Sequence, residues 1–224
     1  MTVGRQDEVR VLLNRDRIVR AATELIEREG ADALSMRRVA AELDVAVMSL
    51  YNHVAGKAAL LDAVAERILA GMIIPDDPEL PWTERARSLV WAFRKVAHDY
   101  PRSVTLVLTR KVDAPSGIRP VEHALAIADD AGFDGETSVR IMRALLAYAI
   151  GAQLREVSAA KMLDYLPADR ENPFGLLDPA EFPHVVALQQ ALLSHDPETD
   201  FEFGLDLLIS ALEALPRSEP GRTS

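Results

Sequence analysis

Apolar residues recur at intervals of three and four along most of this 224-residue chain, a spacing that predicts helices nearly throughout. The segment 15–29 shows it well, because Ile18, Ala22, Leu25 and Ile26 fall on one face of a helix. Alternation of apolar and polar residues between turns, which is typical of strands, is scarce. The sequence therefore predicts an all-α fold.

Capping residues predict where the first helices begin and end. Asn14 can cap the first helix, and Gly30 suits the left-handed conformation that ends it. Ser35 can cap a second helix, and a third short helix is expected over 47–53, before a longer one that follows Lys57. Two short helices joined by a tight turn are typical of a helix-turn-helix. Periodicity alone leaves a plain helical bundle equally open.

A cluster of prolines in "IIPDDPELPW" marks an expected domain boundary, because proline removes backbone donors and disfavours helix in the residue before it. The expected domains are 1–70 and 71–224. In the second domain we expect helices over 82–100, 102–112, 121–131, 136–163, 184–194 and 201–215, a turn over 113–120, a loop over 166–183 and a disordered tail over 216–224.

Charge is uneven between these two parts. The formal net charge is -10, yet residues 1–70 hold 10 basic and 11 acidic side chains, so the acidic excess lies in 71–224. Contact with a polyanion depends on the local field, and net charge alone does not exclude it. The absence of cysteine excludes disulfides and thiolate metal sites. No apolar run is long enough to span a membrane, and we expect a soluble cytoplasmic protein without a membrane partner.

The segment 47–54 has the features of a recognition helix. Leu50 and Val54, four residues apart, can face the core and leave small and polar side chains free to enter a DNA groove. Candidate phosphate contacts on either side are the side chains of Arg37, Arg38, Lys57 and Tyr51 and the free backbone N–H groups at the helix start beside Ser35.

The stretches "AATELIEREGADALSMRRVAAELDV" and "SLYNHVAGKAALLDAV" resemble the N-terminal domain of the tetracycline-repressor (TetR) family of bacterial transcription regulators. Further along, "GFDGETSVRIMRALLAYAIGAQLRE" and "FEFGLDLLISALEAL" resemble the family's ligand domain. The resemblance implies a three-helix helix-turn-helix domain and a helical domain for ligand binding and dimerisation. It implies a homodimer that binds a palindromic double-stranded DNA operator, regulates transcription, most often by repression, and is released by a small-molecule effector.

On matching positions, the resemblance assigns base or phosphate contact to Arg37, base reading to Ala46, Val47, Met48 and Ser49, and phosphate contact to Tyr51, His53 and Lys57. Ala46 and Val47 are apolar where drug-responsive members favour polar residues. Readout there would rest on apolar contact, as with thymine methyl groups, and the operator would differ from theirs. The plain alternatives are that Tyr51 packs on the domain surface and that His53 is a structural histidine.

Two segments of the second domain are apolar on more than one side. These are 139–157 and 201–212, and a helix that is apolar all round must be buried all round. The family uses the corresponding helices for a four-helix dimer interface. The alternative is a large monomeric core.

Leu89, Phe93, Leu106 and Leu108 can line an apolar cavity, although core packing is the plain alternative. The positions that hold tetracycline and its magnesium in relatives are occupied here by Ile73, Leu89, Thr105 and Arg155, which differ from the relatives in residue type. Among the matched ligand positions, only Phe93 has the same residue type. Because an arginine repels a cation, we expect no magnesium-tetracycline response. A less polar ligand, or an anion paired with Arg155, fits these side chains better. The segment 166–183 can cover a pocket entrance or simply link two helices.

No pattern in the sequence indicates catalysis or a cofactor. None of the five histidines has a second histidine three or four residues away, so no helical turn carries a metal-binding pair. A Gly-rich phosphate loop and a nucleophile elbow are also missing. We therefore expect no enzyme. The alternative to a regulator is a small-molecule-binding helical protein without DNA activity.

Overall fold

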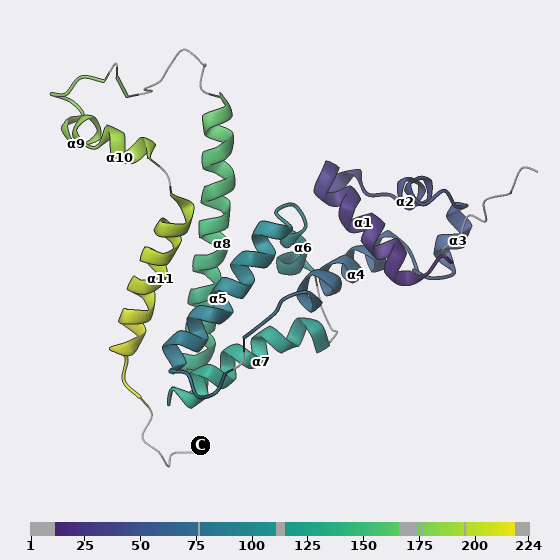
Figure 1. Cartoon of the computed structure of the whole chain (residues 1–224), viewed down its shortest axis with the longest axis horizontal. Helices are drawn as coiled ribbons and strands as arrows, with labels where there is room; N and C mark the ends of the chain where they lie inside the picture. Colours follow the sequence, from purple (N-terminus) through teal and green to yellow (C-terminus); the bar gives the residue numbers. More distant parts are fainter. Residues whose placement is uncertain are drawn as a thin grey trace, which may run out of the picture. The chain divides into compact units, whose positions relative to one another are not determined.

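The computed structural model describes residues 12–75, 77–110, 115–165, 174–175, 177–194 and 196–217. Helices are the only regular elements in these ranges, which confirms the predicted all-α class (Figure 1). The N-terminal helices are α1 (Arg15–Glu29), the 3₁₀ turn η1 (Ala31–Ala33), α2 (Met36–Glu42), α3 (Val47–Tyr51) and α4 (Lys57–Ala70). The later helices are α5 (Trp82–Asp99), α6 (Val104–Thr109), α7 (Pro115–Asp130), α8 (Gly135–Tyr165), α9 (Pro183–Ala187), α10 (Gln189–Leu193) and α11 (Pro197–Glu213). Within the described part of the chain, no helix is long and apolar enough to cross a membrane.

The chain divides into two compact units. The first combines the described residues up to Ile73 with those of Val96–Arg119, and the second combines Ile74–Lys95 with those from Pro120 onward. The first unit therefore includes α6, which packs along α4 although it follows α4 by more than thirty residues in sequence.

Local capping starts α1 and α2 where the sequence predicts. The Asn14 side chain accepts a hydrogen bond from the Arg17 N–H at 2.8 Å, and Ser35 accepts one from the Arg38 N–H at 3.2 Å. Gly30 ends α1 with a φ of 90°, a conformation that side chains with a Cβ rarely adopt. The predicted apolar face of α1 is buried together with Leu60 and its neighbours on α4. These two helices form the core on which the helix-turn-helix rests.

The second unit is built on α5, α7, α8 and α11. Phe201 and Leu205 are fully buried on α11, against α8. The Tyr148 hydroxyl donates to the Phe201 carbonyl oxygen at 2.6 Å, and a Cβ at Gly204 would overlap the Tyr148 ring. The two helices therefore approach closely at a position where only glycine leaves room.

Two sequence predictions of elements are wrong. The segment 113–120 is not a turn over its described part, because Pro115 starts α7 and Pro120 lies inside it. Proline at the first helical position has a φ already suited to the helix, and Pro120 removes only one hydrogen bond. The helix predicted over 184–194 is broken at Leu188 into α9 and α10. Neither short helix has a buried side chain, so no packing favours a single continuous helix.

The remaining expectations fall mostly outside the described residues. The expected loop over 166–183 has no helix at its described positions before Pro183, and most of the expected tail lies beyond the last described residue. The long helix predicted over 136–163 is confirmed as α8, and Gly132, at φ 81°, follows the end of α7 as predicted.

Candidate nucleic-acid interface and effector domain

Helix α3 is anchored by one face and open on the other. Leu50 is fully buried and Val54 nearly so, as their spacing predicts. Met48 is 72% exposed and Tyr51 46% exposed, whereas Val47 is half buried and packs partly on the core. Ala46 is exposed and Ser49 half buried at the same end of the helix. The first turn of α3 thus offers small and flexible side chains to a binding partner.

The tight turn before α3 depends on one residue with unusual backbone geometry. Asp44 has a φ of 52°, in the left-handed region that aspartate tolerates better than most side chains. The Val45 N–H then donates to the Ala40 carbonyl oxygen at 3.0 Å. This turn sets the direction of α3 relative to α2.

Cationic and polar side chains lie at the helix starts on either side of α3 in the sequence. Arg37 and Lys57 are exposed, and neither forms an ion pair with any described residue. Arg38, by contrast, is bound to Glu29 of α1 at 2.5 Å. His53 is exposed just after α3. Of the two neighbouring arginines, Arg37 is therefore the one without an ion pair to the described residues, and its guanidinium is open to a phosphate.

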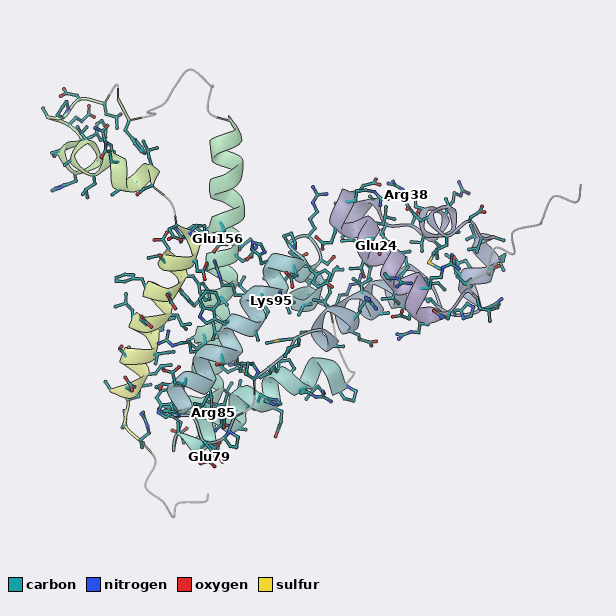
Figure 2. The ribbon with its side chains drawn as sticks, viewed as in Figure 1. Glu24, Arg38, Glu79, Arg85, Lys95 and Glu156 are labelled. Carbon is teal, nitrogen blue, oxygen red and sulfur yellow. The ribbon has the colours of Figure 1, made fainter. Side chains whose placement is uncertain are left out.

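An ion-pair network joins the last turn of α1 to α2 (Figure 2 labels Arg38 within it). Arg28 pairs with Glu42 at the end of α2, and also with its neighbour Glu29. The hydrogen bond from Arg38 holds the pKa of the Glu29 carboxyl below its ordinary value. The network fixes the helix that precedes the recognition helix.

The residues proposed for ligand contact divide between the two units. Ile73, Thr105 and Leu108 belong to the first unit and are exposed, Ile73 by 83%. Leu106, which the sequence places beside a cavity, is instead buried in the core of the first unit. Leu89, Phe93 and Arg155 belong to the second unit, where Leu89 is half buried and Phe93 almost fully buried.

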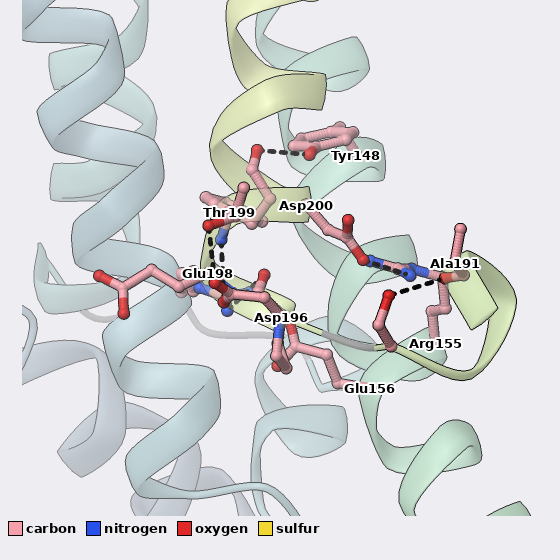
Figure 3. Close-up of polar contacts among 12 residues, drawn as sticks. Tyr148, Arg155, Glu156, Ala191, Asp196, Glu198, Thr199 and Asp200 are labelled. Atoms are coloured by element: carbon pink, nitrogen blue, oxygen red, sulfur yellow. Dashed lines mark hydrogen bonds and ion pairs between the residues drawn. The ribbon is translucent and has the colours of Figure 1, made fainter.

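Arg155 has a protein partner at the surface of the second unit. Its guanidinium pairs with Asp200 of α11 at 3.1 Å, and both side chains are about half exposed (Figure 3). A surface pair of this kind is weak, typically below about 1 kcal/mol. The charge of Arg155 is therefore balanced by a carboxylate of the same unit.

The sequence reasoning missed a buried charged cluster in the second unit. Arg94 of α5 is almost fully buried, pairs with Glu156 of α8, and donates to the Pro197 carbonyl oxygen at 3.2 Å. Its guanidinium carbon lies 4.2 Å from the centre of the Phe201 ring and 5.5 Å from that of Trp91. The only sequence signal is an arginine on the apolar side of α5, three residues after Trp91.

A second buried polar group of this unit, unlike Arg94, has no partner among the described residues. The side-chain oxygen of Gln153 on α8 accepts no hydrogen bond from the residues that the structure describes. The described residues contain no group of three side chains arranged to hold a metal ion.

In the first unit, an open groove of about 670 Å³ runs between α1 and α4, beside the ion pairs Arg15–Glu66 and Asp16–Arg67. None of the seven residues that the sequence proposes for ligand contact lines this groove.

Comparison with protein families assigns both parts of the chain. Residues 18–64 match the model of bacterial regulatory proteins of the tetR family. Residues 74–215 match the model of the tetracyclin repressor-like C-terminal domain. The first range contains α2 and α3, and the second contains the Arg94 cluster.

Three relatives show the extent of the similarity. A transcriptional regulator of Saccharopolyspora erythraea is 30% identical over 66% of this chain, which is 63% of that protein's length. The repressor DrrR1 of Streptomyces coeruleorubidus is 30% identical over 95% of this chain and 82% of its own. The class D tetracycline repressor of Escherichia coli is 31% identical over 90% and 89%.

A solved structure agrees with this assignment. The Streptomyces coelicolor TetR family protein ActR, in complex with actinorhodin, is 27% identical and has a TM-score of 0.72, with 90% of this chain and 96% of that one covered. The chain therefore belongs to the TetR family: it is a DNA-binding transcriptional repressor with a ligand-responsive C-terminal domain, and not an enzyme.

Proposed function

We propose that this repressor works as a homodimer that presents α3 of each copy to successive major grooves of a palindromic operator. A small molecule bound in the C-terminal domain releases it from that operator. The observation that carries the proposal is the division of α3, where Leu50 is buried while Met48 and Tyr51 project into solvent. A recognition helix needs this division because one face must be held while the other reads DNA.

The contact residues fall into two roles. Ala46, Val47, Met48 and Ser49 read base edges, mainly through apolar contact and one hydroxyl. The phosphate contacts come from the α2 start, the end of α3 and the α4 start, through Ser35, Arg37, Tyr51, His53 and Lys57. Val47 contributes least, since it is partly covered by the core.

Exposed apolar side chains on α8 and α11 support the dimer. Phe203 and Leu207 on α11 are 67% and 58% exposed, on the side opposite the buried Phe201 and Leu205. On α8, Leu154 is similarly exposed. Apolar side chains that one copy leaves in water, at helical spacing, fit burial against a second copy.

The effector we infer is a largely apolar molecule bound without magnesium. Leu89 and Phe93 lie one turn apart on α5 and are sheltered from solvent, which suits apolar contact. Arg155 occupies the position at which a bound magnesium ion would need a carboxylate ligand, and the charge of Arg155 is balanced by Asp200. Ile73, Thr105 and Leu108 belong to the first unit and are exposed, and their contact with a ligand stays a prediction from the family resemblance.

A gel-shift titration with DNA flanking the protein's own gene tests the proposal. Operator binding also implies that the protein works in the cytoplasm, where the chromosome lies. We expect a discrete complex at low salt, and its loss when an effector quenches the fluorescence of Trp82 or Trp91. Absence of any complex would favour the alternative of a small-molecule-binding helical protein without DNA activity. Effector binding with unchanged DNA affinity would contradict the switching part.

A further inference from the structure

A carboxylate from α1 holds the start of α6. Glu27 accepts the Ser103 N–H at 2.7 Å with one oxygen and the Arg102 N–H at 3.2 Å with the other. Ser103 is the N-cap of α6 and Arg102 precedes it, so both N–H groups lie at the entry to the helix, where its dipole favours a negative charge. Glu27 is half buried and Ser103 fully buried, so water competes little for the bond to the Ser103 N–H, whereas Arg102 is exposed.

Arg102 makes the reciprocal contact to α1. Its guanidinium donates to the Arg28 carbonyl oxygen at 2.5 Å. Arg28 lies in the last turn of α1, where carbonyl groups lack helical partners and the dipole favours a positive charge. The start of α6 thus receives a negative charge from α1, and the end of α1 receives a positive charge from the residue that precedes the N-cap of α6. We name Glu27, Arg28, Arg102 and Ser103 the helix-end clamp.

The same turn of α1 also holds α2. The Arg28 side chain pairs with Glu42, and the next residue, Glu29, pairs with Arg38 at 2.5 Å. The last turn of α1 is therefore tied to α6 through Glu27 and to α2 through Glu29. At its other end α6 is tied to α4, because Arg110 pairs with Asp62 at 3.3 Å.

Helix α6 has an unusual place in the chain. It lies within the range of the C-terminal family model, 74–215, but it packs in the same compact unit as the DNA-reading helices. A displacement of the start of α6 therefore acts first on the last turn of α1. It then acts on α2 through the ion pairs of Arg28 and Glu29. Packed helices with charged connections shift as units rather than deform continuously.

We propose that Glu27 and Arg102 are positioning residues, and that the helix-end clamp sets the tilt of α2 and α3 and so the spacing of operator half-sites that the dimer accepts. This inference rests on the proposed function. It differs from a plain stabilising role, because loss of the clamp should alter which spacing is preferred and not only how stable the first unit is.

The first test measures the clamp without DNA, by hydrogen exchange of the full chain. Glu27→Gln keeps the shape but removes the charge and one acceptor oxygen, and the Arg102 and Ser103 amides should then exchange on the order of tenfold faster. Glu24→Gln, an equal charge change at an exposed position of α1, should leave them unchanged (Figure 2). Ser103→Ala should also leave them protected, since it keeps the N–H and removes a hydroxyl that has no partner.

The second test uses the selected operator and two versions with one base pair added or removed between half-sites. The wild type should prefer its own spacing, and Glu27→Gln and Arg102→Gln should reduce that preference about fivefold or more, since each interrupts a charge-assisted bond. Glu27→Asp should restore part of the preference because it keeps the charge, and Glu24→Gln should not change it.

The outcomes separate the two claims. Faster exchange with an unchanged spacing preference would reduce the clamp to a stabilising contact and overturn the positioning role. Unchanged exchange in Glu27→Gln would overturn the clamp itself. A wild type that binds no duplex would overturn the proposed function and the positioning role together, while the exchange result would still judge whether the clamp's hydrogen bonds exist.

Discussion

At the scale of single residues, the DNA-reading unit separates side chains that anchor from side chains left free. Arg38 is held by Glu29, whereas its neighbour Arg37 and the more distant Lys57 have no ion pair among the described residues. Free cations at helix starts suit phosphate contact, since a phosphate is bound equally on any sequence. Exposed side chains of α3 suit base reading.

Lys57→Ala tests this division. It should weaken binding to every duplex alike and reduce the slope of log affinity against log salt by roughly one. Fluorescence anisotropy at several salt concentrations, with the operator and with unrelated DNA, gives both quantities. An effect confined to the operator would assign Lys57 to base reading and contradict its phosphate role.

Met48→Ala should behave in the opposite way. Met48 projects from the first turn of α3, so its loss should change the preferred base at one position of each half-site by about 1 kcal/mol or more, and leave the salt slope alone. Competition among single-base operator variants measures this preference. Equal weakening on all variants would show that Met48 does not read sequence.

Tyr148 gives a pH-dependent signature in the second unit. Burial raises the pKa of its phenol, whose hydroxyl donates to the Phe201 carbonyl. Because the folded pKa lies above the unfolded value of about 10, its contribution to stability is complete below that pH and is lost as the pH rises through the folded value. Near-ultraviolet titration should show a late tyrosine phase that Tyr148→Phe removes, at a cost in stability of about 1 kcal/mol. A late phase that persists in Tyr148→Phe would contradict this assignment.

At the scale of helices, the contact of α8 with α11 depends on Gly204. A Cβ there would overlap the Tyr148 ring, so Gly204→Ala should lower the free energy of unfolding by about 1–3 kcal/mol despite the better helix propensity of alanine. Gly135→Ala at the start of α8 is the control, because a Cβ there meets nothing within 4 Å. Denaturant unfolding measures the free energy of unfolding of both variants. Equal values for Gly204→Ala and Gly135→Ala would contradict the close approach of α8 and α11.

Many helix ends can be predicted from local chemistry, whereas contacts between segments distant in sequence cannot. Asn14, Ser35 and Gly30 set the ends of α1 and α2 through hydrogen bonds and backbone angles within a few residues. Helix α6 packs on α4 and α1, which lie more than thirty residues earlier in the sequence, and no local pattern encodes such a contact. For the same reason, Leu106 was assigned to a cavity but is buried in the first core.

The site shows the same limit. The anchoring of α3 by Leu50 and Val54 follows from their spacing of four, and the structure confirms it. The burial of Arg94 against Glu156 and Phe201 depends on how α5, α8 and α11 meet, which no pattern within one helix predicts. Prolines at 115 and 120 favoured a turn by composition, but both fit within α7.

At the scale of the whole molecule, the proposed function requires two copies. Leu207→Lys places a charge on the exposed apolar side of α11 and should convert the dimer to a monomer, with loss of operator binding. Ile118→Lys, on a comparably exposed residue of α7, is the control and should leave assembly unchanged. Sedimentation equilibrium measures the mass, and a dimeric Leu207→Lys would move the interface elsewhere.

The most direct measurement of the central claim is selection of bound sequences from random duplexes by the full-length protein. Two copies that place α3 in successive major grooves should enrich an inverted repeat whose half-site centres lie about 34 Å apart, or a multiple of that distance. Enrichment of a single unrepeated site, or no enrichment at low salt, would contradict the account.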